Sequence, residues 1–373
     1  MDLFVSPKAL NPGPLNPMTN RIEELKQKIA DGRRVTSEEA GSLFSLDPVE
    51  LGRLGDTRRK LVFPKEQVGF IIDRIVNYTN ICEAACDFCA FHSRAGRIDP
   101  YELSTDDILL KIETLVAAGG TQVMLQGGLH PEYTLDVYVD LVRAIKDRFP
   151  DICLHSFSPA ELMHISGKAG MDVYDVVGIL KNAGLDSVPG ASDLLVDRIR
   201  AKVSPRKITT GDWCDVMNVL HRHGMKSSAT MTYGMGETLD ERIAHLEVIR
   251  EVQDRTGIIR AFIPWSFSPA MTGMADILPA SGIDYLKILA IARIFLDNVV
   301  YIQAGWLTEG QKIAQIALTM GANDMGGVLM EEMVVRSTGI EAKTDMNEMI
   351  RVIRNTGKTP VQRDSDYRVI KRF

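Results

Sequence analysis

Residues 68–93, VGFIIDRIVNYTNICEAACDFCAFHS, join a short β-branched run to a loop that holds three of the chain's five cysteines. The run is typical of a buried strand. Cys82, Cys86 and Cys89 follow it at spacings of four and three residues. This spacing is too short for a disulfide framework, and three thiols are one ligand short of a closed metal site with four ligands. The segment therefore raises two questions: which fold begins here, and what occupies the fourth position.

After this strand, helical patterns alternate with short apolar runs to the end of the chain. For example, STDDILLKIETLVAAGG precedes TQVMLQGG, and TTGDWCDVMNVLHRHG precedes MKSSATMTYG. Counting the first strand gives about eight βα units, the number that closes a parallel (β/α)8 barrel of the TIM type. The segment near ANDMGG is the poorest strand of the set, so an incompletely closed barrel is the alternative.

The sequence divides into three parts around this α/β barrel. Residues 1–62 are expected to form an N-terminal arm and a helical preface. Their first 18 residues are rich in Pro and Asn, and capped helical patterns such as TSEEAGSLF follow. Residues 63–340 are expected to form the barrel, and residues 341–373 a C-terminal helix and a tail packed on it. In such a barrel, catalytic side chains lie in the loops that follow the strands.

The bulk composition excludes several classes of protein. With 373 residues, a net charge of −6 and a pI near 5.7, the chain gives no electrostatic reason to bind nucleic acid or an anionic membrane. The N-terminus lacks the pattern of a signal peptide, and no stretch reaches the roughly 20 apolar residues that cross a bilayer. We expect a cytoplasmic protein, because a reducing compartment keeps its few thiols available for metal.

The three-cysteine loop fits an iron–sulfur cluster with one open iron. A 4Fe-4S cubane normally takes four thiolates, and Cys82, Cys86 and Cys89 supply three from one loop. The open iron can chelate the amino and carboxylate groups of S-adenosylmethionine. An electron from the cluster then splits the sulfonium and leaves a 5′-deoxyadenosyl radical. Phe88, just before Cys89, gives the loop an apolar side for the adenine.

A structural zinc site is the alternative interpretation of this loop, with His92 or His130 as the fourth ligand. Structural zinc commonly pairs two short Cys/His hairpins. The remaining cysteines, Cys153 and Cys214, stand alone in apolar periodic segments and are expected to be small buried hydrophobes. A binding barrel held by zinc, without catalysis, is the corresponding alternative function.

The motifs NYTNIC, CDFCAF, GGLHP, ATMTYG and GANDMGG resemble the radical S-adenosylmethionine superfamily. Within it, they are similar to the group that contains the futalosine enzymes of menaquinone biosynthesis and the FO synthase subunits. AFIPWSF, GWLTEG, VLMEE and the tail TGKTPVQRDSDY are most similar to the dehypoxanthine futalosine cyclase family. The resemblance covers nearly the whole chain and implies a radical S-adenosylmethionine barrel.

The resemblance implies a set of residues that bind the cofactor. Gly127 and Gly128 stand where the superfamily's Gly-rich strand end meets the methionine amino group, although an ordinary βα turn also suits them. Asp186 and Ser187 match a strand end that reaches the nucleoside ribose, although Asp186 also suits a helix cap. Lys207 is the candidate partner of the methionine carboxylate, and a solvated surface lysine is the alternative.

Candidates for catalysis come from strand ends that should face the cavity. His130 and His155 are candidates either to hydrogen-bond a substrate carboxylate or to transfer a proton, and His130, in a rigid turn before Pro131, is preferred. A structural histidine bonded to backbone is the alternative for each. Glu237 is a possible base or ribose contact, or only a carboxylate favoured by the start of a helix. Trp265 and Phe267 alternate on one strand, which suits either stacking on an aromatic substrate or core packing.

The implied reaction is cyclisation of dehypoxanthine futalosine. The adenosyl radical would take hydrogen from the ribose 4′ position, and the carbon radical would attack the benzoate ring. An external flavodoxin or ferredoxin would supply electrons, because no flavin motif or second cluster motif is present. Aminofutalosine synthase and an FO synthase subunit, in which a radical adds to an acceptor, are the alternatives within the group.

Four residues in three motifs depart from the cyclase pattern. Ala191 and Ser192 in PGASD replace consecutive glycines, Met333 stands where Asn is usual, and Glu309 replaces a common Gln. All are expected near the substrate side of the barrel. A shifted substrate is therefore an alternative that leaves the cofactor prediction unchanged.

Overall fold

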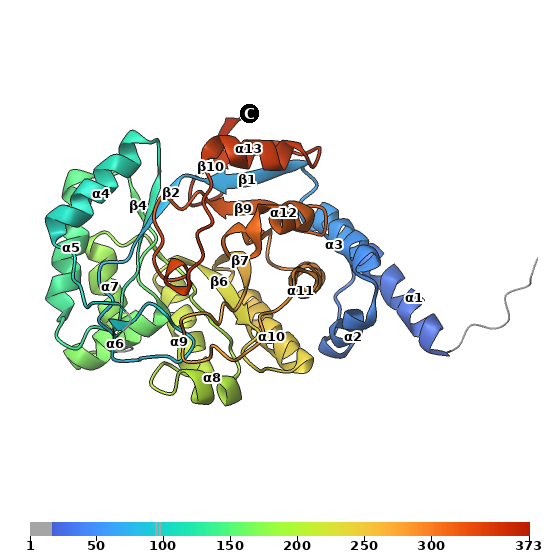
Figure 1. Ribbon diagram of the computed structural model, residues 1–373, viewed down its shortest axis with the longest axis horizontal. Coiled ribbons are helices and arrows are strands. Elements are labelled where there is room, and N and C mark those ends of the chain that lie inside the picture. Colours follow the sequence, from blue (N-terminus) through green and yellow to red (C-terminus); the bar gives the residue numbers. More distant parts are fainter. Residues whose placement is uncertain (1–16, 94–95, 97) are drawn as a thin grey trace, which may run out of the picture.

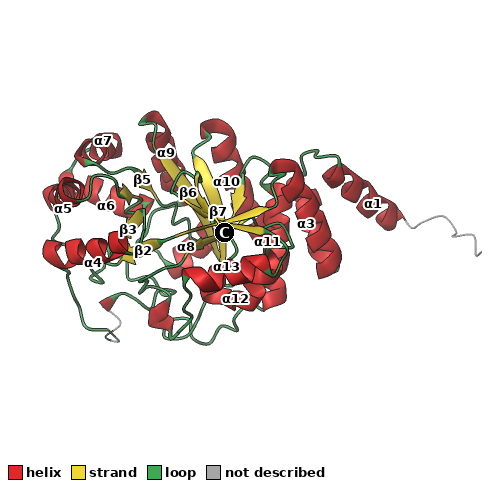
Figure 2. Cartoon of the chain, turned by 90° about the horizontal axis from the view of Figure 1, so that it is seen from above, coloured by secondary structure: helices red, strands yellow, loops and turns green. Residues whose placement is uncertain are grey.

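The computed structural model describes residues 17–93, 96 and 98–373 of the protein (Figure 1). Short parallel strands lie in the middle of the molecule and helices surround them (Figure 2). The barrel strands are β1 (Gln67–Ile71), β2 (Asp73–Val76), β3 (Gln122–Leu125), β4 (Cys153–Leu154), β5 (Ser187–Val188), β6 (Lys226–Tyr233), β7 (Ile259–Ser266), β8 (Tyr301–Ile302) and β9 (Asp324–Gly327).

The strand pairings confirm the predicted βα barrel. β1 and β2 are two halves of the first strand, so the described residues contain eight barrel strands. β2 pairs with β3 and β3 with β4, β5 to β8 pair in order, and β9 pairs with β1. Single parallel bridges, His155 with Ser187 and Gln303 with Asp324, join the remaining neighbours. The pairing therefore continues around the ring, and it is thinnest at β4–β5 and β8–β9.

The helices between the strands begin at side-chain caps that the sequence encodes. Ser104, Thr209, Thr238 and Ser281 each accept a hydrogen bond from the third residue of the following helix, whose acidic side chain caps in return. The barrel helices are α4 (Thr105–Ala117), α5 (Leu135–Arg148), α6 (Pro159–Ala169), α7 (Val173–Ala183), α8 (Asp197–Val203), α9 (Thr210–Arg222), α10 (Leu239–Thr256), α11 (Gly282–Phe295) and α12 (Trp306–Ala317). No helix in the described part of the chain is both long enough and apolar enough to span a bilayer.

The C-terminal tail extends the sheet beside β1. After α13 (Met346–Arg354), strand β10 (Thr359–Arg363) runs parallel to β1, and β11 (Val369–Arg372) returns antiparallel to β10. Figure 1 shows α13 and β10 next to β1. The sequence analysis did not predict these two strands, because β10 is only five residues long and contains Pro360.

The helical preface packs against the side of the barrel. It consists of α1 (Pro17–Ala30), α2 (Ser37–Ser42) and α3 (Pro48–Val62), and α3 lies along α11, across the molecule from α4 and α5 (Figure 1). A Cβ atom on Gly55 would lie 2.3 Å from the carbonyl oxygen of Met320. Glycine at this position thus lets α3 approach the segment before β9 closely.

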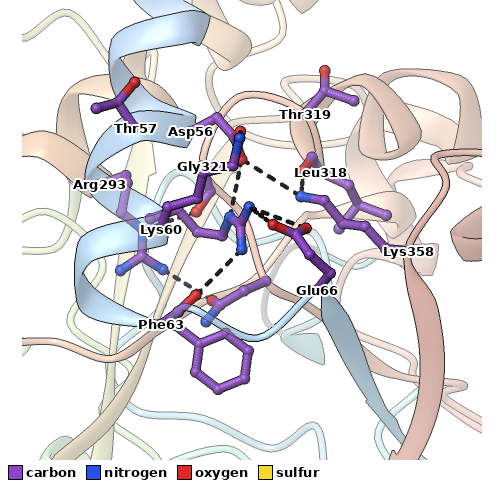
Figure 3. A network of polar contacts seen from close by, with 12 residues as sticks. Asp56, Thr57, Lys60, Phe63, Glu66, Arg293, Leu318, Thr319, Gly321 and Lys358 are labelled. Carbon is purple, nitrogen blue, oxygen red and sulfur yellow. Dashed lines mark hydrogen bonds and ion pairs between the residues drawn. The ribbon is translucent and has the colours of Figure 1, made fainter.

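A polar network around the buried Arg59 and Arg293, which we call the anchor network, lies where α3 meets the barrel and the tail, and Lys358 joins it to Asp56 of α3 at 3.7 Å (Figure 3). It comprises Asp56, Arg59, Glu66, Arg293 and Lys358. Arg59 binds Asp56 at 2.9 Å, Glu66 at 2.9 Å and the carbonyl oxygens of residues 63 and 65. Arg293 donates from all three nitrogens. The acceptors are the carbonyl oxygens of residues 321, 299 and 300 and the side-chain oxygen Oδ1 of Asn323. Burial, with help from Arg59, lowers the pKa of Arg293 to about 9.

Candidate functional site

The three-cysteine loop is held against the end of β3. The backbone N–H of Leu129 donates to the Cys82 sulfur at 3.3 Å, and the N–H of Glu83 donates to the carbonyl oxygen of Leu129 at 2.9 Å. A Cβ atom on Gly128 would lie 2.2 Å from the carbonyl oxygen of Ile81. Gly128 is therefore required by the close approach of the loop, and it lies beside the first cysteine.

The surroundings of the sulfur atoms fit thiolate ligands. All three cysteines are free. Burial raises the pKa of the Cys86 thiol to about 12 and also raises the pKa of Cys89. Backbone N–H groups of Phe91 and His92 point at Cys89 and oppose this rise. The N–H of Leu129 donates a hydrogen bond to the Cys82 sulfur. Such donors stabilise the sulfurs of an iron–sulfur cluster, and iron supplies the remaining stabilisation by replacing the proton.

A cavity of about 320 Å³ runs from this loop into the barrel. Phe88 and Cys89 line its mouth, and Trp265, Phe267 and Trp306 contribute aromatic walls. Its deep end, which we call the cavity floor, is lined by His155, Arg260, Arg363, Ser365 and Tyr367. The last three belong to the C-terminal tail, so the tail contributes directly to the site.

Lys207 lies beside the cysteine loop in a largely buried ion pair. Its ammonium group is 2.6 Å from Asp193 Oδ2 and 5.7 Å from the centre of the Phe88 ring. Its side chain is only 17% exposed, so the alternative of a solvated surface lysine is wrong. Asp193 lines the cavity and adopts φ +48°, and Ala191 adopts φ +37° in the same turn. Such strained backbone is held in place at the cavity wall, where it sets the position of the Asp193 carboxylate.

Gly127 also has a packing reason to be glycine. A Cβ atom there would lie 2.5 Å from the ring of Tyr78. Its N–H donates to Glu161 Oε1 at 3.2 Å, and the Tyr78 hydroxyl donates to the same atom at 2.8 Å. Burial raises the pKa of Glu161 to about 7. The sequence analysis missed Glu161, because a glutamate in the first turn of a helix resembles an ordinary cap.

Comparison with known proteins matches these features to a family. Residues 76–249 match the model described as the radical SAM superfamily, and residues 255–372 match the CofH/MqnC C-terminal region. The chain is 40% identical over 356 residues to the cyclic dehypoxanthine futalosine synthase of Halalkalibacterium halodurans, which covers 94% of this chain and 96% of that protein. The chain belongs to the radical S-adenosylmethionine superfamily. The predicted resemblance is thereby confirmed, and the chain is an enzyme of radical chemistry.

Other relatives of this radical S-adenosylmethionine enzyme carry two different names. The cyclic dehypoxanthine futalosine synthase of Streptomyces coelicolor is 39% identical over 93% of this chain and 88% of its own. The 5-amino-6-(D-ribitylamino)uracil–L-tyrosine 4-hydroxyphenyl transferase of Methanococcoides burtonii is also 39% identical, over 94% of this chain and 99% of its own. These similarities therefore establish the superfamily, but they do not distinguish between the two reactions.

Solved structures support the fold of the superfamily member. Methylornithine synthase (PylB) matches with a TM-score of 0.72 and 18% identity, covering 90% of this chain and 97% of that one. The FeFe-hydrogenase maturase HydG from Carboxydothermus hydrogenoformans matches with a TM-score of 0.74 and 18% identity, over 94% and 81%. At this level of identity the likeness concerns the fold alone.

Asp186 and Ser187 are not among the residues that line the cavity. Asp186 precedes β5 and therefore lies at the amino end of that strand, away from the βα loops. Its carboxylate binds the N–H of Leu154 at 2.7 Å and Lys146 at 2.7 Å. The predicted contact of Asp186 with the ribose is therefore wrong. The motif was assigned to the carboxyl end of β5, whereas Asp186 stands at the amino end of this two-residue strand. Ser187 turns inward, with Oγ 2.8 Å from Arg260 and 2.9 Å from His155.

The two residues predicted for catalysis are committed to other contacts. The Glu237 side chain has no solvent exposure and accepts hydrogen bonds from the N–H groups of Gly234 and Met235 and from Arg242. His130 stacks on Tyr133 with ring centres 3.9 Å apart, and its Nδ1 accepts from the N–H of Glu132. Both residues shape turns beside the barrel mouth, and neither is among the residues that line the cavity.

The cavity contains carboxylates that the sequence analysis did not single out. Asp73, at the start of β2, lines the cavity and accepts from the N–H of Leu329 at 3.2 Å. Burial raises its pKa to about 6. A Cβ atom on Gly327 would lie 2.0 Å from Asp73 Oδ1. Glycine in the ANDMGG segment therefore allows the backbone to pass close to the Asp73 carboxylate. Glu332 also lines the cavity but is held by the N–H groups of Val335 and Arg336.

Proposed function

We propose that this enzyme cyclises dehypoxanthine futalosine to its cyclic product in menaquinone biosynthesis. The reaction would begin with hydrogen abstraction at the ribose 4′ position and end with a bond from that carbon to the benzoate ring. The observation that carries the proposal is a cavity with aromatic walls that is lined by Phe88 and Cys89 of the cysteine loop. Two relatives at 40% and 39% identity carry the name of this activity.

The cofactors of the superfamily have suitable residues in this chain. Cys82, Cys86 and Cys89 would hold a 4Fe-4S cluster, whose sulfurs would accept the backbone N–H groups already aimed at them. Phe88, beside Cys89, would support the adenine, and Lys207 would place positive charge next to the loop. When bound, the cluster and S-adenosylmethionine supply a 5′-deoxyadenosyl radical at the cavity mouth.

The protein's own contribution is to orient the substrate and to exclude other hydrogen donors. Trp265 and Trp306 offer flat apolar surfaces on which an aromatic ring can stack. Thr230 and Thr232 on β6 add hydroxyls to the wall, which suits a sugar. A primary alkyl radical takes almost any C–H, so a dry cavity that holds one substrate carbon near the mouth determines the product.

Turnover with defined substrates tests the proposal. Anaerobically reconstituted enzyme is incubated with dithionite, S-adenosylmethionine and dehypoxanthine futalosine. We expect 5′-deoxyadenosine and one cyclic nucleoside product in equal amounts. Formation of 5′-deoxyadenosine without a cyclic product would contradict the proposal, because it would show radical chemistry that does not couple to this substrate.

The second candidate is the 4-hydroxyphenyl transferase reaction. It is favoured by the 39% identity to the Methanococcoides burtonii enzyme over 99% of that protein's length. The same assay with L-tyrosine and 5-amino-6-(D-ribitylamino)uracil separates the two. Only the transferase would give a product that contains both the uracil and the hydroxyphenyl group.

We also propose an external electron donor, a flavodoxin or a ferredoxin, and a cytoplasmic location. Three cysteines in one loop account for a single cluster, and the two other cysteines lie apart in β4 and α9. An acidic small redox protein is therefore expected to replace dithionite in the turnover assay. A reducing compartment also suits free thiols that must bind iron.

A further inference from the structure

Arg260 reaches the cavity because β7 contains a bulge. Ser227 pairs with Ile259 and Ala229 pairs with Phe262, so three steps along β7 oppose two along β6. Neighbouring residues of a regular strand point to opposite faces, whereas an extra residue re-aims a side chain. As a result, both Arg260 and the adjacent Ala261 line the cavity.

Contacts on two sides hold the Arg260 guanidinium in place. Nη1 donates to the carbonyl oxygen of Ser365 at 2.6 Å and to Asp366 Oδ1 at 3.1 Å. Nη2 donates to Ser187 Oγ at 2.8 Å and to His155 Nδ1 at 3.2 Å. The tail and strands β4 and β5 thus fix one cation at the cavity floor, where only 12% of its side chain is exposed.

The same contact determines where His155 carries its proton. A guanidinium can only donate hydrogen bonds, so His155 Nδ1 must be the acceptor and the ring proton must lie on Nε2. Burial, reinforced by Arg260 and Arg363, lowers the pKa of His155 well below its usual range. His155 is therefore a neutral donor at Nε2 and not a residue that exchanges protons near neutral pH, as the sequence analysis had considered.

Two donors at the floor remain without an acceptor. Within residues 17–93, 96 and 98–373, neither Arg260 Nε nor His155 Nε2 makes a hydrogen bond to another residue. Both side chains line the cavity. Neither atom is among the buried side-chain atoms that lack a partner, so both donors are open to the cavity. A ligand that brings acceptor oxygens can therefore bind to them directly.

We propose that the cavity floor binds the carboxylate of the substrate, with Arg260 and His155 as its donors. The proposal rests on the proposed function, in which the substrate carries a benzoate. A carboxylate only accepts hydrogen bonds and matches a guanidinium in charge. Arg363 is already neutralised by a bidentate contact with Asp324 at 2.6 and 2.8 Å, and Asp366, the partner of Arg260, is 51% exposed.

This position also orients the substrate along the cavity. Trp265 follows Arg260 by five residues on β7, which corresponds to roughly 17 Å of extended strand. A benzoate anchored at the floor would therefore direct its ring toward the aromatic walls and its sugar toward Phe88 and Cys89 at the mouth. The carbon that loses hydrogen would then face the end of the cavity where the radical forms.

Binding measurements test the proposal independently of turnover. Trp265 and Trp306 line the cavity, so quenching of tryptophan fluorescence in the reconstituted holoenzyme reports occupancy. The ligands are dehypoxanthine futalosine and its neutral carboxamide analogue, with benzoate and benzamide as small probes. We expect the carboxylates to bind on the order of 10- to 100-fold more tightly than the amides, as for a charge-assisted hydrogen bond in a buried site.

Variants assign this preference to the two donors. Arg260→Gln should abolish the preference for carboxylate while leaving the affinity for the amides nearly unchanged. His155→Phe should reduce the preference, whereas His155→Gln, which keeps an N–H donor, should retain more of it. Arg255→Gln serves as the matched control, because Arg255 lies on α10 with a side chain that is 51% exposed, and it should behave as wild type.

The outcomes separate this proposal from the proposed function. Equal binding of carboxylates and amides, no binding of any of the four ligands, or a preference that survives Arg260→Gln would overturn the floor as a carboxylate site. If Arg260→Gln does not fold, the two His155 variants decide the matter by the same criterion. A preference that depends on Arg260, found without cyclic product, would support the floor and refute the cyclase reaction. Formation of the cyclic product together with equal binding of carboxylates and amides would support the cyclase reaction and refute the floor as a carboxylate site.

Discussion

The anchor network and the cavity floor are both buried and both built around arginine, yet they differ in how completely their donors are used. Every nitrogen of Arg293 has an oxygen acceptor from the protein. At the floor, Arg260 Nε and His155 Nε2 have none among the described residues. The first arrangement fits a role in stability alone. The second leaves hydrogen-bonding capacity for a ligand, and this contrast distinguishes structural from functional polar groups.

The largest expected effect lies at the mouth of the cavity. Replacing Cys82, Cys86 or Cys89 individually with alanine should remove most of the iron and acid-labile sulfide from reconstituted protein, because a cubane cannot be held by two sulfurs of this loop. Iron content and the visible absorbance band measure the loss. Cys214→Ala on α9 is the matched control and should keep the full complement. A full cluster in all three loop variants would contradict the assignment.

The anchor network predicts the next largest effect, on stability. Arg293→Ala leaves the carbonyl oxygens of Gly321 and Val299 without these donors, and Val300 keeps only its hydrogen bond from the Asn323 side-chain amide. We expect the free energy of unfolding to fall by about 3–5 kcal/mol, measured by urea denaturation. Arg53→Ala, on the exposed side of α3, should change it by less than about 0.5 kcal/mol.

Loss of stability without loss of carboxylate preference would sharpen the contrast between the two regions. The surviving folded Arg293→Ala protein should still distinguish benzoate from benzamide, because the anchor network lies outside the cavity. Normal stability in Arg293→Ala would show that the segment from residue 299 to residue 323 does not depend on this arginine.

Sequence patterns predicted the barrel because they follow local rules. Alternating helical and apolar segments, caps such as Ser104 and Thr238, and the three cysteines depend on residues close together in the chain. Lys207 was predicted to pair with the methionine carboxylate, and that role stays a prediction; its ammonium group pairs with Asp193 and lies over the Phe88 ring.

The floor could not be predicted in this way, since it arises from pairing between distant segments. Arg260 stands in IIRAFIPWSF, which resembles a continuous buried strand, and only its register with β6 creates the bulge. The tail residues Arg363 and Tyr367 join the site only because β10 pairs with β1. Asp186 was mispredicted because it precedes β5 and lies at the amino end of that strand, whereas the motif was interpreted as the end that reaches the rim.

A third prediction concerns Asp73 and the pH dependence of stability. Burial raises its pKa to about 6, whereas an unfolded aspartate titrates near ~3.9. Between these two pKa values the folded state binds more protons than the unfolded state. The contribution of Asp73 to stability is therefore fully present below the unfolded pKa and is lost as pH rises through the folded pKa. Asp73→Asn removes that loss and should be more stable than wild type at pH 8, by at most about 3 kcal/mol.

Urea denaturation of both proteins at several pH values checks this expectation. The advantage of Asp73→Asn should shrink steadily as pH falls from about 8 to about 4. An advantage of the same size at every pH would mean that the Asp73 carboxylate is ionised in the folded cavity throughout this range. Burial would then not raise the pKa of Asp73, in contrast to the expectation for a poorly partnered carboxylate in the cavity.

The smallest effect tests whether the two regions are energetically separate. Asp47 caps α3, where its carboxylate accepts from the N–H groups of Val49 and Glu50. Asp47→Ala should cost about 1 kcal/mol of stability, and Asp47→Asn, which keeps an acceptor oxygen, should cost less. Since the cap touches only the preface, iron content and the preference for carboxylate should stay at wild-type values in both variants. A change in either would mean that the preface controls the cavity through α11, and the floor could then no longer be treated as independent of the anchor network.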